Sequence, residues 1–294
     1  MKRINVIIII FLVLQALLFA YWFHRIQKQI FETRPDTVYI RTVPPYDTLM
    51  PAQLMTQLKL SDQAVMATLF QQSAAEYRAL CYQAFAAARV MLDNDLNDKS
   101  VDSPRAIIVD IDETILDNSP HSAKCIINGT SYPAFWDEWC DTAIAKAVPG
   151  ALEFLNLARG YGVSVFYITN RKAHLQEVTM KNLRQLKFPQ VEEKHMMFRT
   201  GESSKENRRN EVKKTYHITM LIGDNLGDFS DVFGDKLVAE RTKITDSLSQ
   251  MFGRRYIVLP NAMYGDWEGA LYGYDYSISD SAKHAIRYES LQAY

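Results

Sequence analysis

The stretch Ala106-Ile-Ile-Val-Asp-Ile-Asp-Glu-Thr114 carries two carboxylates, Asp110 and Asp112, out of an apolar run and into a polar turn. A short run of β-branched residues is typical of a buried central strand. Ligands bind at the carboxyl edge of open α/β sheets, where we expect both side chains to lie. Acids two residues apart can offer one side chain and one backbone carbonyl to the same hard cation. The stretch therefore indicates either a Mg²⁺ site for phosphoryl chemistry or a simple turn, since Asp is also a common turn residue.

Three later segments place further polar groups at the ends of apolar runs or at the start of a helix. The run from residue 163 ends in Thr169 and Asn170, and the run from residue 218 leads to Asp224 and Asp228. Between them, Lys205 begins a basic helical segment. Hydroxyl, amide and ammonium groups donate hydrogen bonds to phosphate oxygens. The order of these groups favours a phosphate site over a simple turn.

This order of motifs resembles that of the haloacid dehalogenase-like (HAD) superfamily, whose phosphatases use an aspartate nucleophile. It is most similar to the class C non-specific acid phosphatases, typified by bacterial outer-membrane lipoprotein acid phosphatases. The resemblance runs from about Gln63 to Glu268. It rests on four strings of sequence: Asp112-Glu-Thr-Ile-Leu-Asp-Asn-Ser119, Val148-Pro-Gly150, Gly223-Asp-Asn-Leu226 and Leu259-Pro-Asn-Ala-Met-Tyr-Gly-Asp-Trp-Glu-Gly269.

The resemblance implies a mechanism and a role for each residue. Asp110 would attack phosphorus and form an aspartyl-phosphate, because a carboxylate is a competent nucleophile once the charge around it is neutralised. Asp112 would protonate the leaving oxygen and then deprotonate the hydrolytic water. Mg²⁺ would be held by Asp110, the Asp112 backbone carbonyl and Asp224, with Asp228 steering a bound water, and the phosphate oxygens by Thr169, Asn170 and Lys205.

Two of these assignments have alternatives. The resembling family usually has adjacent acids where this chain has a single Asp228 after a glycine, so Asp224 is the firmer metal ligand. Lys205 stands among charged neighbours, a setting that is also typical of a solvated helix face. Lys213 and Lys214 are less well placed to serve in its stead.

An insertion at residues 119–149 follows the first motif. In the resembling family this region contributes to a small lid whose aromatic groups stack on a ring-bearing substrate, which makes Trp136 and Trp139 candidate stacking residues and Tyr264 a third. The spacing of the two tryptophans suits one buried helix face equally well. The resemblance implies organic phosphomonoesters as substrates, nucleoside monophosphates such as nicotinamide mononucleotide among them, and the sequence does not rank them.

The cysteines and the net charge bear on the disulfide state of the chain, on zinc binding and on the kinds of partner expected. In an exported domain Cys125 and Cys140 could pair in a disulfide, while Cys81 is expected to be a small core residue. The alternative is that all three cysteines are reduced and buried. No C-x-x-C pair is present, so zinc is not expected. A net charge of −1 gives no reason to expect nucleic acid as a partner. Homo-oligomerisation is left open.

Residues 6–23 form an apolar segment in which Gln15 is the only strongly polar residue, preceded by Lys2 and Arg3. A helix of this length, at about 1.5 Å per residue, nearly spans a bilayer core of about 30 Å. A cleavable signal sequence is the alternative, although the segment exceeds the usual signal core of roughly 7–15 residues. No cysteine precedes Cys81, so lipid anchoring is not supported. The resemblance implies a membrane-anchored or secreted protein with its catalytic domain on the periplasmic or extracellular side.

We therefore expect three parts in the chain: a membrane anchor or signal segment at 1–32, an extended tether with prolines at 33–60, and a HAD-like phosphatase domain at 61–294. Ser61 is the expected N-cap of a packing helix that continues to about Leu96. After it, strands at 105–111, 163–169, 195–198, 218–223 and 255–259 alternate with helices at 150–160, 172–187 and 205–215. This alternation predicts an α/β fold with a doubly wound parallel sheet, which the resemblance identifies as a HAD-like Rossmannoid core with a small helical cap.

The function that follows is an exported, Mg²⁺-dependent acid phosphatase. Two alternatives remain. A phosphotransferase or mutase would use the same phosphorylated aspartate, but it usually needs a larger closing cap than the insertion at 119–149 supplies. A non-catalytic surface binding or storage protein on the same scaffold would be marked by loss of the first aspartate, and Asp110 is present.

Overall fold

The computed structural model describes Tyr21 and residues 59–294. The chain divides into two units between residues 56 and 57, and every element named below belongs to the second, residues 57–294. The predicted anchor at 1–32 and tether at 33–60 lie almost entirely outside the described residues. Within the described part, no helix is both long enough and apolar enough to cross a bilayer.

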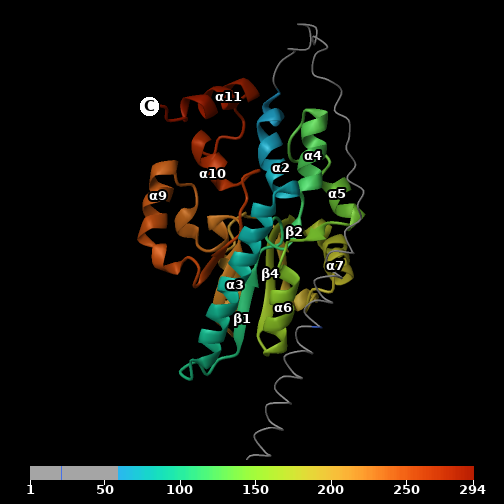
Figure 1. Cartoon of the computed structure of the whole chain (residues 1–294), viewed down its shortest axis with the longest axis vertical. Coiled ribbons are helices and arrows are strands. Elements are labelled where there is room, and N and C mark those ends of the chain that lie inside the picture. The colour runs from blue at the N-terminus through green and yellow to red at the C-terminus, as the bar shows by residue number, and fades with distance from the viewer. Residues whose placement is uncertain (1–20, 22–58) are drawn as a thin grey trace, which may run out of the picture. The chain divides into compact units, whose positions relative to one another are not determined.

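A five-stranded parallel sheet runs through the centre of the second unit (Figure 1). Its order is β5-β4-β1-β6-β7. The chain therefore adds β4 and β5 on one side of β1, and then returns to add β6 and β7 on the other side. Ligands of open α/β sheets bind at the carboxyl ends of the strands where this reversal occurs. The strands are β1 (Arg105–Val109), β4 (Ser164–Lys172), β5 (Met196–Arg199), β6 (His217–Gly223) and β7 (Tyr256–Val258).

Helices connect the strands, and α3 and α6 lie across the near face of the sheet in Figure 1. The α-helices are α2 (Val65–Ser73), α3 (Ala75–Asn97), α4 (Ser119–Asn128), α5 (Trp136–Thr142), α6 (Ala151–Gly160), α7 (Gln176–Gln185), α8 (Glu206–Lys213), α9 (Val238–Ser247), α10 (Asp266–Gly269) and α11 (Asp280–Glu289). Short 3₁₀ turns are η2 (Leu60–Ala64), η3 (Ala173–Leu175), η4 (Glu193–His195), η5 (Leu226–Asp228), η6 (Asp231–Phe233), η7 (Ser249–Met251) and η8 (Ala270–Tyr272). A small antiparallel pair joins β2 (Leu116–Asp117) to β3 (Lys146–Ala147).

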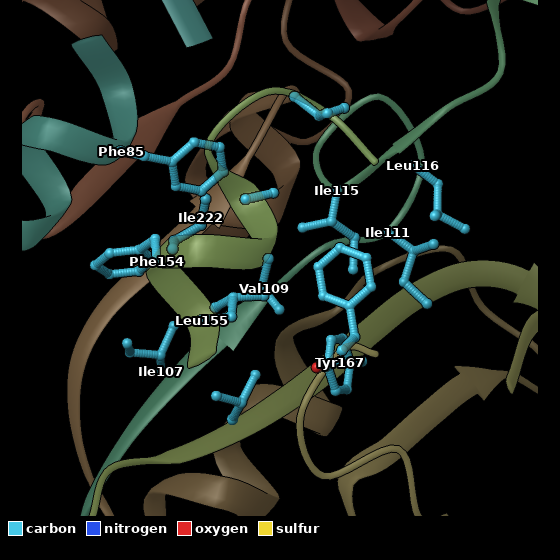
Figure 2. Close-up of a cluster of buried hydrophobic side chains, with 14 of the residues drawn as sticks. Phe85, Ile107, Val109, Ile111, Ile115, Leu116, Phe154, Leu155, Tyr167 and Ile222 are labelled. Atoms are coloured by element: carbon cyan, nitrogen blue, oxygen red, sulfur yellow. The ribbon is translucent and has the colours of Figure 1, made fainter. Parts of the chain in front are cut away.

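Side chains of β1 alternate between two apolar cores, because successive residues of a strand point to opposite faces of a sheet. Ile107 and Val109 belong to the larger core, which α3 and α6 complete (Figure 2). Ala106 and Ile108 belong to a smaller core on the other face, where Val212 of α8 packs. Helices thus cover both faces, and the predicted doubly wound parallel α/β fold is confirmed.

The predicted single helix from Ser61 to Leu96 is wrong in two respects. The chain forms the turn η2 and then two helices, because Ala74 adopts an extended conformation with ψ 129° and ends α2. The Ser61 hydroxyl caps nothing and has no hydrogen-bond partner among the described residues. Leu69 and Leu80, whose helical spacing within this segment predicts positions that face the core, are 46% and 42% exposed.

The insertion at 119–149 consists of α4, α5 and β3. All three cysteines are free and buried. The disulfide between Cys125 and Cys140 is therefore wrong, and the reduced alternative holds. Burial raises the pKa of the Cys140 thiol to about 12, so this sulfur stays protonated at neutral pH.

Candidate active site

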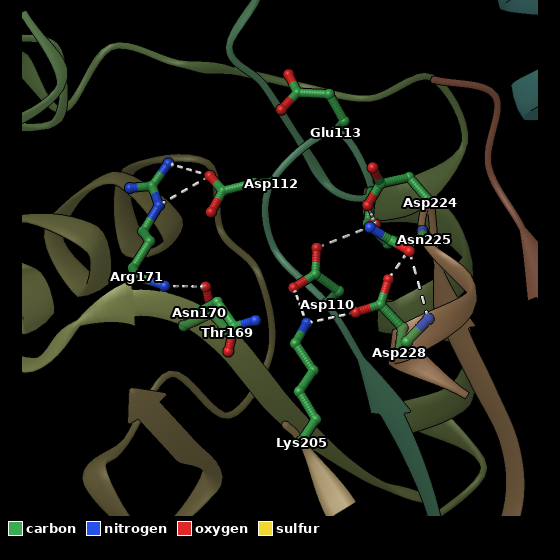
Figure 3. A network of polar contacts seen from close by, with 12 residues as sticks. Asp110, Asp112, Glu113, Thr169, Asn170, Arg171, Lys205, Asp224, Asn225 and Asp228 are labelled. Atoms are coloured by element: carbon green, nitrogen blue, oxygen red, sulfur yellow. Dashed lines mark hydrogen bonds and ion pairs between the residues drawn. The ribbon is translucent and has the colours of Figure 1, made fainter. Parts of the chain in front are cut away.

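Asp110 occupies the first position beyond the central strand β1. Its backbone N–H donates to the carbonyl oxygen of Ile222 on β6 at 2.9 Å, so the pairing of the two strands continues up to this residue. Asp224 follows directly after β6. Because neighbouring parallel strands end at the same edge of the sheet, the two carboxylates meet there (Figure 3).

Three carboxylates form a compact cluster at this edge. Asp110, Asp224 and Asp228 each present an oxygen, and these oxygens lie within 4.8 Å of one another. Burial raises the pKa of Asp110, and burial together with the charge of Asp228 raises that of Asp224. Carboxylates crowded in this way are costly to ionise unless a cation neutralises them. Hard oxygen donors in this arrangement suit Mg²⁺, so the residues present fit a divalent metal.

Neutral side chains orient these carboxylates. The Thr114 hydroxyl lies 3.3 Å from Asp110 Oδ2 and 3.2 Å from Asp224 Oδ1. Asn261 donates from Nδ2 to Asp224 Oδ2 at 2.8 Å. Partners of this kind fix the direction in which ligand oxygens point, which is how outer residues tune a metal site.

Lys205 is buried between two of the carboxylates and is not on a solvated helix face. Its ammonium pairs with Asp110 and lies 2.6 Å from Asp228 Oδ1 (Figure 3). The alternatives Lys213 and Lys214 are exposed. Arg209 is also buried, and its Nη1 donates to the backbone carbonyl oxygens of Gly227 and Asp228 at 2.8 and 2.9 Å. Helix α8 therefore fixes both the ammonium and the loop that carries Asp228.

Thr169 and Asn170 lie on β4, the strand next to β1. Thr169 is buried and its hydroxyl oxygen accepts the backbone N–H of Arg171 at 3.0 Å. Asn170 is exposed, and its Oδ1 accepts from Arg208 Nη2 at 2.7 Å. With its oxygen engaged, the amide nitrogen of Asn170 is the group left to donate to a ligand.

The Asp112 side chain is directed away from the carboxylate cluster. Its Oδ1 accepts from Arg171 Nε at 2.9 Å and pairs with Arg171 Nη2 at 2.8 Å (Figure 3). Asn118 Nδ2 donates to the same oxygen at 2.8 Å. Its side chain is thus not one of the clustered metal ligands, and a metal-binding role for Asp112 rests on the backbone carbonyl alone.

The three aromatic candidates contact different groups. Tyr264 is 39% exposed, and its hydroxyl donates to the carboxylate of Glu113. The half-buried Trp139 donates from Nε1 to Asn118 Oδ1 at 2.8 Å. The Arg171 guanidinium lies 5.3 Å from the ring centre of Trp136. Both tryptophans therefore contact residues that hold Asp112.

Several residues at this site were not singled out from the sequence. Glu113 is fully buried with φ +54°, and it accepts the backbone N–H of Asn118 at 2.8 Å. Burial and the charge of Asp112 raise the pKa of Glu113 to about 8. Thr114 and Asn118 lie within the first string of the resemblance, so the signal for their importance was present in the sequence.

Gly223 supplies the space that the carboxylate cluster needs. A Cβ at this position would lie 2.6 Å from Cγ of Asp228. We expect Gly223→Ala to displace Asp228 and to weaken Mg²⁺ binding by about 10-fold or more, measured by titration calorimetry of the purified chain. Gly160→Ala is the matched control, because a Cβ there meets nothing within 4 Å. Equal Mg²⁺ affinity in both variants would remove Asp228 from the metal site.

Comparisons with known proteins show which family this chain belongs to. The family model described as HAD superfamily, subfamily IIIB (Acid phosphatase) matches residues 47–267. The structure of the class C acid phosphatase from Bacillus anthracis is 41% identical, covers 81% of this chain and 100% of its own, and superposes with a TM-score of 0.78. A structure of that enzyme with tungstate bound gives the same values. The stem 31 kDa glycoprotein of Glycine max is 28% identical over 167 residues, which span 53% of this chain and only 58% of that protein.

Proposed function

Because this chain belongs to the acid phosphatases of subfamily IIIB of the HAD superfamily, and is a phosphomonoesterase of the class C type, we propose that it hydrolyses its substrates through an aspartyl-phosphate on Asp110. The observation that carries the proposal is the setting of Asp110. The carboxylate stands at the end of the central strand, against the Lys205 ammonium and beside Asp224 and Asp228. An anionic nucleophile can approach a phosphate dianion only where nearby positive charge offsets the repulsion between them.

The reaction proceeds in two displacements at phosphorus. In the first, a carboxylate oxygen of Asp110 forms a bond to phosphorus while the bond to the leaving oxygen breaks, and Asp112 gives that oxygen its proton. In the second, Asp112 takes a proton from water, the water oxygen bonds to phosphorus, and the carboxylate of Asp110 departs. Asp112 thus ends each cycle protonated, as it began.

Charge on the non-bridging oxygens is offset by donors from two elements. The Lys205 ammonium at the start of α8 and the Thr169 and Asn170 side chains at the end of β4 act on these oxygens. Arg208 holds the oxygen of the Asn170 amide, which leaves the amide nitrogen as the donor for a phosphate oxygen. Fixed donors of this kind lower the barrier because they need no reorganisation when charge develops.

Magnesium is the cofactor that we propose for the carboxylate cluster. Asp110, Asp224, Asp228 and the backbone carbonyl of Asp112 would hold it. The ion would neutralise the charge shared by nucleophile and phosphate. The mutually repelling carboxylates support this assignment, because the Lys205 ammonium supplies only one positive charge for the three of them.

Ring-bearing phosphomonoesters, including nucleoside monophosphates, are the proposed substrates. Tyr264 supports this assignment, because its partly exposed ring is tethered through the hydroxyl to Glu113, next to Asp112. A partly exposed aromatic ring that is held at its hydroxyl end suits stacking. Trp136 and Trp139 contribute less to stacking in this proposal, because they contact Arg171 and Asn118.

The proposed site of action is outside the cytoplasm, with the amino-terminal segment as anchor or signal. The apolar run at residues 6–23 after two basic residues supports this proposal. Amino-terminal sequencing of the chain recovered from membrane and soluble fractions of the cell tests it. A chain that begins at Met1 in the membrane fraction fits an anchor, and one that begins after residue 20 fits a signal; an intact chain in the cytosolic fraction contradicts both.

Phosphate release by the purified full-length chain tests the proposed function. The substrates are p-nitrophenyl phosphate and a panel of nucleoside monophosphates, each with Mg²⁺ and with EDTA at acidic and neutral pH. We expect release that falls to background with EDTA and returns when Mg²⁺ is added in excess. Parallel assays with an added alcohol acceptor count transferred phosphate. Transfer that exceeds hydrolysis indicates a phosphotransferase, and no turnover by folded, Mg²⁺-loaded protein indicates a binding protein.

A further inference from the structure

Among residues 59–294, the hydrogen bonds and the ion pair that hold the Asp112 carboxylate all go to one of its two oxygens. Arg171 Nε and Nη2 and Asn118 Nδ2 all act on Oδ1, at 2.9, 2.8 and 2.8 Å. Three donors around one oxygen fix both the position and the rotation of a carboxylate. The second oxygen, Oδ2, is then the one available to carry a proton to or from a ligand.

We infer that Asn118 and Arg171, together with Trp136 and Trp139 of the insertion, form a clamp that positions Asp112 for proton transfer. We call these four residues the Asp112 clamp. This inference rests on the proposed function, in which Asp112 is the acid and base. It assigns to the insertion a part in the chemical step, in addition to any contact with substrate.

Arg171 is fixed on several sides. Its side chain is buried, Nη1 donates to Thr179 Oγ1 on α7 at 3.1 Å, and Nη2 donates to Asn118 Oδ1 at 3.2 Å. The ring of Trp136 lies within cation–π range of the guanidinium. A guanidinium held in this way cannot follow Asp112 if that side chain moves, so it restores one orientation.

Asn118 is fixed as firmly, and its amide has only one workable orientation. Its Oδ1 accepts from Trp139 Nε1 and Arg171 Nη2, while its Nδ2 donates to Asp112 Oδ1 and to Glu113 Oε2. A flipped amide would set its oxygen against two carboxylates and its nitrogen against two donors. The indole N–H of Trp139 is therefore one of the groups that fix which way Asn118 points, and through Asn118 it acts on where Asp112 lies.

The clamp predicts a dependence of rate on the leaving group. A p-nitrophenolate leaves with little help from an acid, whereas an alkoxide needs its proton. The ratio kcat/KM reports the steps up to departure of the leaving group, so it isolates this proton transfer from the later hydrolysis of the phosphoenzyme. A positioning residue of Asp112 should therefore affect alkyl phosphates more than p-nitrophenyl phosphate.

The experiment compares the wild type with Trp139→Phe, Arg171→Lys and Asp112→Asn on p-nitrophenyl phosphate, adenosine monophosphate and glycerol 2-phosphate. For Arg171→Lys we expect kcat/KM on both alkyl phosphates to fall on the order of 100-fold, and for Trp139→Phe about 10-fold, with a smaller loss on p-nitrophenyl phosphate. Asp112→Asn should show the same preference in a stronger form. Trp267→Phe is the matched control, because it also removes an indole N–H, from a ring that is 46% exposed.

The substrate panel separates the clamp from the alternatives. If the tryptophans only stack on substrate, Trp139→Phe will impair the two ring-bearing substrates and spare glycerol 2-phosphate, which overturns the clamp. A loss that is equal on all three substrates also overturns it, because that is the mark of a general structural role. Failure of the proposed function looks different, since the wild type itself would then release no phosphate. Trp139→Phe keeps an aromatic ring in place, so it serves even if Arg171→Lys does not fold.

Discussion

Exchange of Asp110 for Asn is expected to abolish turnover while the fold stays intact. The amide has nearly the shape of the carboxylate but is not a nucleophile toward phosphorus, so the first displacement cannot occur. Loss of a nucleophile costs on the order of 10⁴- to 10⁶-fold in kcat in well-studied hydrolases, and we expect a loss of this size on p-nitrophenyl phosphate. The amide oxygen can still accept from Lys205, and the variant also relieves the crowding of the three clustered carboxylates.

The control for this variant is Asp102→Asn, which makes the same chemical change at an exposed residue shortly before β1. Thermal unfolding and circular dichroism of both variants should match the wild type, or Asp110→Asn should unfold at a slightly higher temperature. Phosphate release by Asp110→Asn within 10-fold of the wild type, without deamidation back to Asp, would exclude Asp110 as the nucleophile.

Replacement of Lys205 by Met has the second largest expected effect. The methionine keeps most of the buried apolar stem but removes the ammonium from between Asp110 and Asp228. Loss of one fixed donor to a transition-state oxyanion costs about 10²- to 10³-fold, so kcat on p-nitrophenyl phosphate should fall by this factor. Removing one partner of a buried ion pair also leaves the other charge uncompensated, at a cost of about 3–5 kcal/mol.

The stability effect of Lys205→Met should depend on Mg²⁺. Without metal, the free energy of unfolding should fall, since two buried carboxylates lose their cation. Saturating Mg²⁺ should recover part of the loss, because a ligand that binds only the folded state stabilises it. Lys214→Met is the control, as it removes an exposed lysine directly after the same helix. Equal activity in the two variants would exclude Lys205 from the phosphate-binding role proposed for it.

The sheet was predictable because its signal is local. Each strand of the sheet coincides with an apolar run, and the observed bounds differ from the predicted ones by at most three residues. The break at Ala74 was not predictable, because alanine is the strongest helix former and nothing in the local sequence opposes a continuous helix. The exposure of Leu69 and Leu80 has the same origin, since the break changes which residues of the helical pattern face the core.

The meeting of the candidate site residues was predictable for a topological reason. Asp110, Asp224 and Lys205 follow apolar strands or begin a helix, and parallel strands bring such positions to one edge. The direction of the Asp112 side chain was not predictable, because it is set by hydrogen bonds from Arg171 and Asn118. Arg171 is distant from Asp112 in the sequence, and Asn118 carries no charge that would mark it as a partner. The two tryptophans were also beyond prediction, because a spacing of three residues suits a lid and a buried helix face equally. The hydrogen bond from Trp139 to Asn118 is visible only in the structure.

The covalent step is best examined by trapping the phosphoenzyme. Wild-type protein mixed with p-nitrophenyl phosphate and Mg²⁺ is quenched in acid, reduced with borohydride, digested and sequenced by mass spectrometry, since reduction converts an aspartyl-phosphate to homoserine. We predict homoserine at position 110, dependent on substrate and absent from Asp110→Asn. Homoserine at another aspartate, or none at all in protein that is turning over, would contradict a phosphorylated Asp110 and with it the proposed mechanism.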